Sequence, residues 1–168
     1  MTVNVDQIYT RVHARADAAV EAGVQYLNFS TYLHTTDTEE YIRSLPIESA
    51  FFAPGSFMQN YLSMWAPYLN DDGAYAINNI VSPQAPLPLI DTLGDTGKYV
   101  GAILAEPDKY KAKVFSAATG LYSSDEVSQA ISKVTGKVVK YNQMSVEVFR
   151  SLMPPAVADD AVPMNEVY

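Results

Sequence analysis

Residues 6–30, DQIYTRVHARADAAVEAGVQYLNFS, decide the fold class. Apolar residues recur at helical spacing over 6–22, and Gly23 is placed to end that helix. The run VQYLNFS at 24–30 then predicts a buried strand. A helix followed directly by a strand is typical of the middle of an α/β fold, so we expect a sheet covered by helices.

The remaining sequence continues the alternation. Thr36 and Glu39 form a capping-box pattern that opens a short helix at 37–45. The continuous apolar run at 47–54 is typical of a strand covered on both faces. We further expect an extended connector at 82–90, strands at 73–81, 111–119 and 137–144, and helices at 56–69, 95–104, 123–134 and 145–153. Ser123 and Glu126 form a second capping-box pattern, which opens the helix at 123–134.

Composition narrows the class of protein. The 168 residues are 48% hydrophobic and 18% charged, which suits a globular domain with a real core. A net charge of −8 disfavours nucleic-acid binding, and the lack of cysteine excludes disulfides and thiolate chemistry. The acidic residues occur as adjacent pairs, at 39–40, 71–72 and 159–160, and this spacing is not that of metal ligands. We therefore expect no metal site. Without a signal sequence or a long apolar run, we expect a cytoplasmic protein that does not enter membranes.

Four segments carry a family resemblance: ADAAVEAGVQYLNFST at 16–31, EEYIRSLPIESAFFAPGSFMQNYL at 39–62, PLIDTLGDTGKYVGAIL at 88–104 and SSDEVSQAISKVTGKVVKY at 123–141. In this order they resemble the C-terminal part of the NmrA-like family, atypical relatives of the short-chain dehydrogenases. The resemblance extends to about residue 153. It implies a truncated Rossmann-like parallel sheet with a small α+β C-terminal lobe. We expect a Rossmann-like segment at 1–70, a substrate-type lobe at 71–153 and a tail at 154–168.

The main departure from the family is the lack of a glycine-rich turn. Relatives begin with a strand, a G-x-x-G-x-x-G turn and a helix that together hold the pyrophosphate of a dinucleotide. This sequence contains no such motif. We therefore expect no cofactor, with NADP returning only if a partner chain completes the site. A parallel sheet without its first strands also leaves an open edge, so we expect a homodimer or a partner protein.

Candidate catalytic residues lie in the segment after the strand at 24–30. His34 follows the carboxyl end of that strand, where ligands bind in open α/β sheets, so it is a candidate general base. Tyr32 is a candidate hydrogen-bond donor beside it, and the competing interpretation is an exposed loop histidine. No tyrosine has a lysine four residues later, so we expect no conventional NAD(P)-dependent oxidoreductase. His13 lies one position off the apolar stripe of the first helix and is interpreted as a surface or edge residue.

Candidate substrate-binding residues come from two segments. The aromatic and methionine-rich stretch at 56–69 has helical spacing, which also suits plain core packing. In the resemblance this helix lines the cleft, and the segment after residue 90 faces it. The candidates are Phe57, Asn60, Tyr61, Trp65, Asp91 and Tyr99.

Two functions remain open at this stage. The first is a regulatory module that binds a protein or a small molecule and has lost NAD(P) binding and dehydrogenase chemistry. The alternative is a cofactor-independent isomerase, cyclase or dehydratase that acts on a hydrophobic metabolite. A shortened gene product with little function of its own is a third interpretation.

Overall fold

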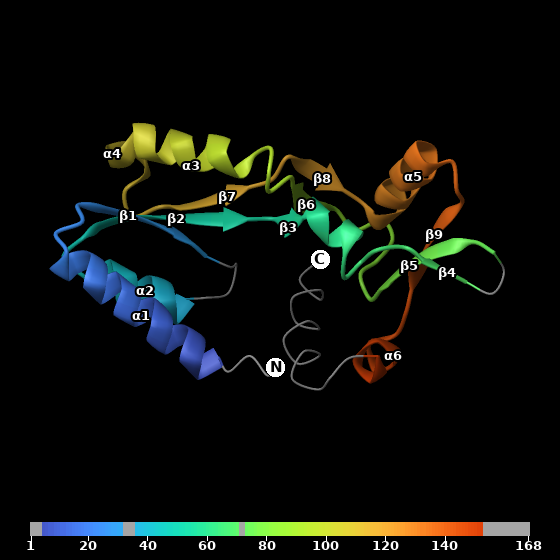
Figure 1. Ribbon diagram of the computed structural model, residues 1–168, viewed down its shortest axis with the longest axis horizontal. Helices are drawn as coiled ribbons and strands as arrows, with labels where there is room; N and C mark the ends of the chain where they lie inside the picture. The colour runs from blue at the N-terminus through green and yellow to red at the C-terminus, as the bar shows by residue number, and fades with distance from the viewer. Residues whose placement is uncertain (1–4, 32–35, 71–72, 153–168) are drawn as a thin grey trace. The chain divides into compact units, whose positions relative to one another are not determined.

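The computed structural model describes residues 5–31, 36–70 and 73–152, which form two compact units (Figure 1). Unit 1 combines residues up to 55 with 90–118. Unit 2 combines residues 56–89 with those from 119 onward. The predicted domains follow chain order, whereas each compact unit is assembled from two separate segments of the chain.

Unit 1 is a three-layer α/β structure built on a parallel sheet. Its strands lie in the order β1-β2-β7, and β2 pairs in parallel with both neighbours. Figure 1 shows α1 and α2 on one face of this sheet and α3 and α4 on the other. Its elements are α1 (Val5–Glu21), β1 (Tyr26–Ser30), α2 (Thr36–Ser44), β2 (Glu48–Pro54), α3 (Thr96–Ala105), α4 (Pro107–Tyr110) and β7 (Val114–Ala117).

The core of unit 1 forms around the central strand. Residues 49–53 of β2 are all buried, as the continuous apolar run predicts for a strand covered on both faces. On the α1–α2 face, Phe51 packs with Ala16 and Ile42, which are almost fully buried. The apolar stripe predicted on the first helix therefore faces the sheet.

Unit 2 contains two small sheets with helices. One has the order β3-β6-β8, and the other has the order β4-β5-β9, with β5 and β9 parallel. Its core joins Val81, Ala85, Leu87 and Leu89. Its elements are β3 (Ser56–Phe57), the 3₁₀ helix η1 (Met58–Leu62), β4 (Tyr68–Leu69), β5 (Tyr75–Asn79), β6 (Leu87–Ile90), β8 (Gly120–Tyr122), α5 (Ser124–Thr135), β9 (Val139–Gln143) and α6 (Val146–Ser151).

The predicted helix at 56–69 is wrong. This stretch forms β3, a single 3₁₀ segment and β4 instead. The Asn60 carbonyl accepts hydrogen bonds from the amides of Ser63 and Trp65, which closes the segment after η1. A continuous helix would also place Pro67 in its interior, where proline removes a hydrogen bond and clashes with the preceding turn.

The proline-rich connector predicted at 82–90 contains strand β6, which pairs antiparallel with β8. Prolines favour an extended backbone on either side, so this segment already has a strand-like conformation. Pairing with β8 then buries Leu87 and Leu89. The sequence indicated the extended backbone but not the strand that pairs with it.

Helix α5 begins with the capping box predicted at Ser123 and Glu126. The Ser123 hydroxyl accepts a hydrogen bond from the Glu126 amide at 3.2 Å, and the Glu126 carboxylate accepts one from the Ser123 amide at 2.8 Å. These bonds satisfy two amides that the helix leaves without partners. Gly136 ends the helix with a φ of 69°, a left-handed conformation that glycine adopts without strain.

The capping box predicts a pH dependence of stability. Hydrogen bonds from Ser123 lower the pKa of Glu126 below its usual 4.5. A lowered pKa in the folded state contributes stability above the unfolded pKa, and this contribution is lost as the pH falls through the folded value. Glu126→Gln should remove this part of the acid destabilisation. Urea unfolding followed by circular dichroism from about pH 7 to about pH 3 measures it. If the wild type and Glu126→Gln lost the same free energy of unfolding over this pH range, the prediction would be contradicted.

Candidate functional site

The carboxyl end of the sheet in unit 1 is the candidate site. The strands β1, β2 and β7 are parallel. Their last residues, Ser30, Pro54 and Ala117, therefore lie at the same end of the sheet. Ligands of open α/β sheets bind outside this carboxyl end. Thr31, Gly55 and Ala118 directly follow the three strands at this end of the sheet.

A partly buried polar pair joins the end of β1 to α2. Thr31 is 2% exposed, and its amide donates to the Phe52 carbonyl at 2.8 Å. Its hydroxyl donates to a carboxylate oxygen of Glu39 on α2 at 2.7 Å. The other Glu39 oxygen lies 3.6 Å from the Arg43 guanidinium. Glu39 is thus a carboxylate held at the carboxyl end of β1 by two neighbours.

Sequence reasoning missed the Thr31–Glu39 pair. Glu39 was assigned only to the capping box with Thr36. The available signal was a hydroxyl residue immediately after a strand, followed by an acid in the first turn of the next helix. That signal does not show which way either side chain turns.

Tyr99 also reaches the carboxyl end of the sheet. Its phenol donates to the Ala118 carbonyl at 2.8 Å, and its ring lies 6.2 Å from the ring of Phe52 and 5.9 Å from that of Phe115. The hydroxyl therefore ties α3 to the chain after β7. This bond already uses the proton that a catalytic phenol would donate.

Asp91 shapes the turn that leads into α3. Its carboxylate accepts from the Leu93 amide at 3.1 Å, and its carbonyl accepts from the Asp95 amide at 2.9 Å. A Cβ at Gly94 would come within 2.5 Å of the Asp91 carboxylate, so the Asp91 side chain would have to shift to accept one. Asp95 stands at the helix N-cap but makes no capping bond with its side chain, which accepts from Lys98 at 2.7 Å.

The other four candidate residues belong to unit 2. Tyr61 packs against the core of that unit, and its ring lies 5.6 Å from the ring of Trp65. Burial, with a smaller contribution from Tyr141, raises the pKa of Tyr61 to about 12. Phe57 ends β3 and Asn60 lies in η1. The structure thus brings Tyr61 and Trp65 together, and Tyr61 serves the core.

The predicted catalytic residues Tyr32 and His34 lie outside the described residues. The segment that contains them joins Thr31, at the end of β1, to the start of α2. Their catalytic roles stay predictions.

His13 is packed within unit 1. Its ring stacks on that of Tyr41, with centroids 3.7 Å apart. The Tyr41 hydroxyl donates to Asp17 at 2.5 Å, and this bond raises the pKa of Tyr41. His13 Nε2 is buried and has no partner among the described residues. The contact links α1 to α2, which a plain surface position would not do.

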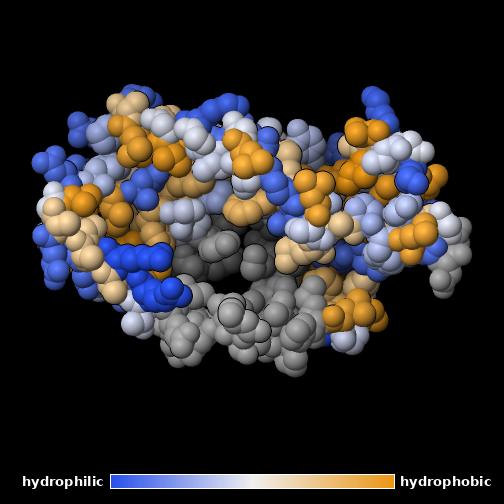
Figure 2. Space-filling model, in the orientation of Figure 1, coloured by the Kyte–Doolittle hydropathy of each residue, from blue (hydrophilic) through white to orange (hydrophobic). Residues whose placement is uncertain are grey.

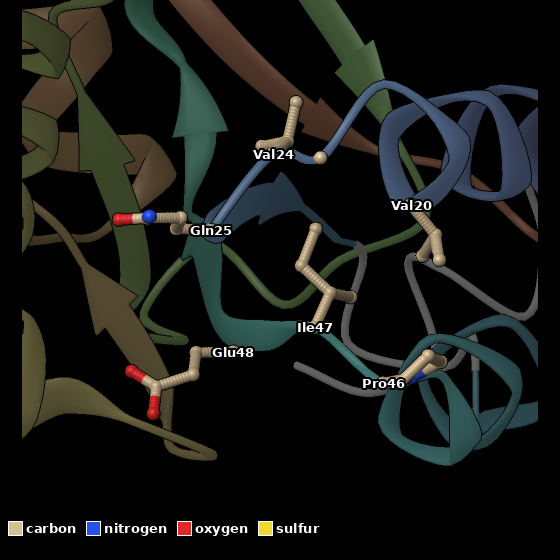
Figure 3. Close-up of a pocket in the computed structure, with 7 residues that line it drawn as sticks. Val20, Val24, Gln25, Pro46, Ile47 and Glu48 are labelled. Carbon is tan, nitrogen blue, oxygen red and sulfur yellow. The ribbon is translucent and has the colours of Figure 1, made fainter.

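An open hollow of about 540 Å³ lies at the amino end of the sheet (Figure 3). Figure 3 shows Val20, Pro46 and Ile47 along its border. The Glu48 carboxylate beside it binds Lys111. Because this end is opposite to the one where parallel sheets bind ligands, the hollow is a weak candidate site.

Apolar side chains are exposed on both units (Figure 2). In unit 2, Leu62 is 84% exposed, Met64 69% and Leu69 59%. These three exposed apolar residues fall within eight residues of the chain, whereas single exposed apolar residues are ordinary.

Residues 5–31, 36–70 and 73–152 contain no group of three His, Asp or Glu side chains that could hold a metal ion. No helix within those ranges is long and apolar enough to cross a bilayer.

Comparison with known proteins gives one family. The sequence matches the NmrA-like family over residues 10–168. The structure is similar to NmrA, a negative transcriptional regulator solved in complex with NADP, at 24% identity and a TM-score of 0.73. That match covers 81% of this chain and 48% of the regulator. The chain therefore spans about half the regulator's length.

Two reductases show the same fold. An NADPH-dependent quinone oxidoreductase of Escherichia coli has 18% identity and a TM-score of 0.72, over 93% of this chain and 59% of that enzyme. The Citrobacter sp. triphenylmethane reductase has 15% identity and a TM-score of 0.70, over 99% of this chain and 62% of the reductase. At these identities the likeness confirms the Rossmann-like α/β fold.

The Thr31–Glu39 bond predicts a measurable contribution to stability. Thr31→Val keeps the shape of the side chain but leaves a partly buried carboxylate oxygen without its donor. The free energy of unfolding should fall by about 1–3 kcal/mol. Thr31→Ser, which keeps the hydroxyl, is the matched control and should lose less. Urea unfolding measures both variants, and a valine variant as stable as the wild type would contradict the assignment.

Proposed function

Since this chain belongs to the NmrA-like family, we propose that it is a non-redox binding module, which holds a protein or a small molecule and does not turn over NAD(P). The observation that carries the proposal is the lack of a glycine-rich turn in the 168 residues. That turn lets a backbone approach the pyrophosphate at a helix N-terminus.

The turns that follow the strands of unit 1 do not fit a dinucleotide. The turn after β1 is TYLHTT at 31–36 and contains no glycine. The turn after β2 contains one glycine, Gly55, whose amide donates to the Ala117 carbonyl at 2.8 Å. That amide is therefore committed to the sheet, and a phosphate would have to displace an existing bond.

The tyrosines of the candidate site also support a non-redox function. A dehydrogenase tyrosine needs a phenol that is free to exchange a proton, with a lysine four residues later to lower its pKa. The Tyr99 phenol donates to a backbone carbonyl, and burial raises the pKa of Tyr61. The raised pKa keeps the Tyr61 phenol neutral near pH 7, and the Tyr99 phenol is engaged in a structural hydrogen bond.

The structural relatives suggest what such a module would do. NmrA is a transcriptional regulator and the other two relatives are reductases. A regulator acts through contacts with other molecules, and the exposed apolar segment around Leu62, Met64 and Leu69 offers surface for such a contact. The regulatory relative is therefore the better guide.

A cofactor-independent enzyme is the second candidate function. The observation that favours it is the Glu39 carboxylate, which accepts a hydrogen bond from Thr31 directly after β1; in the sequence, His34 lies between these two residues. A carboxylate and an imidazole could together move a proton in an isomerisation or a dehydration. The bonds from Thr31 and Arg43 also give Glu39 a structural role, so this function ranks second.

Calorimetric titration of the purified chain with NADP and with NAD tests the proposal. We expect no binding tighter than about 100 μM, roughly −5.5 kcal/mol. The same NADP solution titrated into the E. coli quinone oxidoreductase is the positive control for the ligand. Circular dichroism establishes that the titrated chain is folded. Saturable binding below about 100 μM would overturn the proposal and favour a redox sensor or an oxidoreductase.

A further inference from the structure

Strand β1 is an edge strand of the parallel sheet. In the part of the chain that the structure describes, it pairs with β2 alone. A strand edge presents unpaired amides and carbonyls that can pair with another strand. Which of its groups face outward follows from the register with β2.

The outward groups belong to Tyr26, Asn28 and Ser30. The Thr31 amide donates to the Phe52 carbonyl, so Thr31 faces β2. Along a parallel strand, alternate residues direct both their backbone groups to the same neighbour. The backbone groups of Leu27 and Phe29 therefore also face β2. Tyr26, Asn28 and Ser30 direct their amides and carbonyls away from the sheet.

This edge lacks the features that usually prevent pairing. Natural edge strands are protected by charged side chains, prolines or bulges. The sequence YLNFS of β1 contains no charge and no proline, and its register with β2 runs without interruption.

We propose that two copies of this chain pair antiparallel through β1, about a two-fold axis at Asn28. In this register Asn28 lies opposite Asn28 of the second copy, and Tyr26 lies opposite Ser30. Each opposed pair exchanges two backbone hydrogen bonds, so all three outward residues of both copies are satisfied. The two parallel sheets then form one continuous sheet of six strands.

The same register suits the side chains. Directly opposed residues of antiparallel strands lie on one face and within contact distance. The Asn28 side chains of the two copies would therefore lie side by side at the two-fold axis. Leu27 lies opposite Phe29 on the other face, so apolar side chains meet apolar side chains.

Charge favours this strand as the place of contact between two acidic copies. Each chain has a net charge of −8, so most of its surfaces repel a second copy. No charged residue occurs in 22–30, and the proposed register opposes no like charges along the strand. The inference does not rest on the proposed function, because a second copy carries no glycine-rich turn and would not supply a dinucleotide site.

A cysteine placed on the two-fold axis tests the register, since the natural chain has no cysteine. Opposed residues of a hydrogen-bonded pair have Cα atoms about 5.5 Å apart, within the range of a disulfide. Asn28→Cys should therefore form a covalent dimer under mild oxidation. Ser30→Cys is the matched control, because four residues along the strands would separate its two thiols by roughly 14 Å. It should stay uncrosslinked.

Light scattering should measure the molar mass of the unmodified chain at about 10 and about 200 μM. Because a short interface gives micromolar affinity, the mass should rise with concentration toward twice 18.4 kDa. Ser30→Pro removes an outward amide and leaves the bonds to β2 intact, so it should weaken dimerisation about tenfold. It also provides a test if Asn28→Cys does not fold. A monomer at all concentrations would overturn the proposal. So would a dimer that neither crosslinks at position 28 nor weakens with Ser30→Pro, because another surface would then form it.

The outcomes are separable from those of the titration. A dimer that does not bind NADP agrees with both inferences, and a monomer that does not bind NADP overturns only the dimer. Binding of NADP by the dimer would overturn the proposed function and leave the strand pairing in place.

Discussion

The pairing of β2 with a parallel strand on each side is the constraint on which unit 1 depends. Because helices cover both faces of this strand, residues 49–53 are buried and tolerate only small or apolar side chains. The same register extends one residue past β1, where the Thr31 amide binds the Phe52 carbonyl. That bond positions the Thr31 hydroxyl beside Glu39. The polar pair at the candidate site is therefore a consequence of how the sheet is built.

Local signals predicted the elements that local physics determines. The apolar run at 47–54 became β2, and the capping box at Ser123 and Glu126 is present with both of its bonds. The aromatic stretch at 56–69 misled because its spacing suits a helix, whereas Pro67 and the bonds at Asn60 divide it. Contacts between different elements could not be predicted from local sequence patterns. No such pattern shows that Glu39 turns toward Thr31, or that the Tyr99 phenol binds a backbone carbonyl.

The proposed function and the proposed dimer arise from one feature of the sheet. β1 is its edge strand in the described residues, where a longer parallel sheet would place a further strand. The 168 residues contain no glycine-rich turn, and among the described residues no second strand pairs with β1. Under the two proposals, such a module would not use dinucleotide chemistry and would use this strand for pairing. Its specificity would then depend on contacts outside the sheet, such as the exposed apolar segment of unit 2.

Thermal unfolding with and without NADP tests most directly the claim that the chain has no dinucleotide site. A ligand that binds only the folded state stabilises it by about 2.7 kcal/mol at a hundredfold excess over its dissociation constant. NADP near 10 mM would therefore reveal even a site with a dissociation constant of about 100 μM. We predict that NADP leaves the unfolding temperature unchanged. A rise that saturates with NADP, and that sodium phosphate at the same ionic strength does not produce, would contradict the claim.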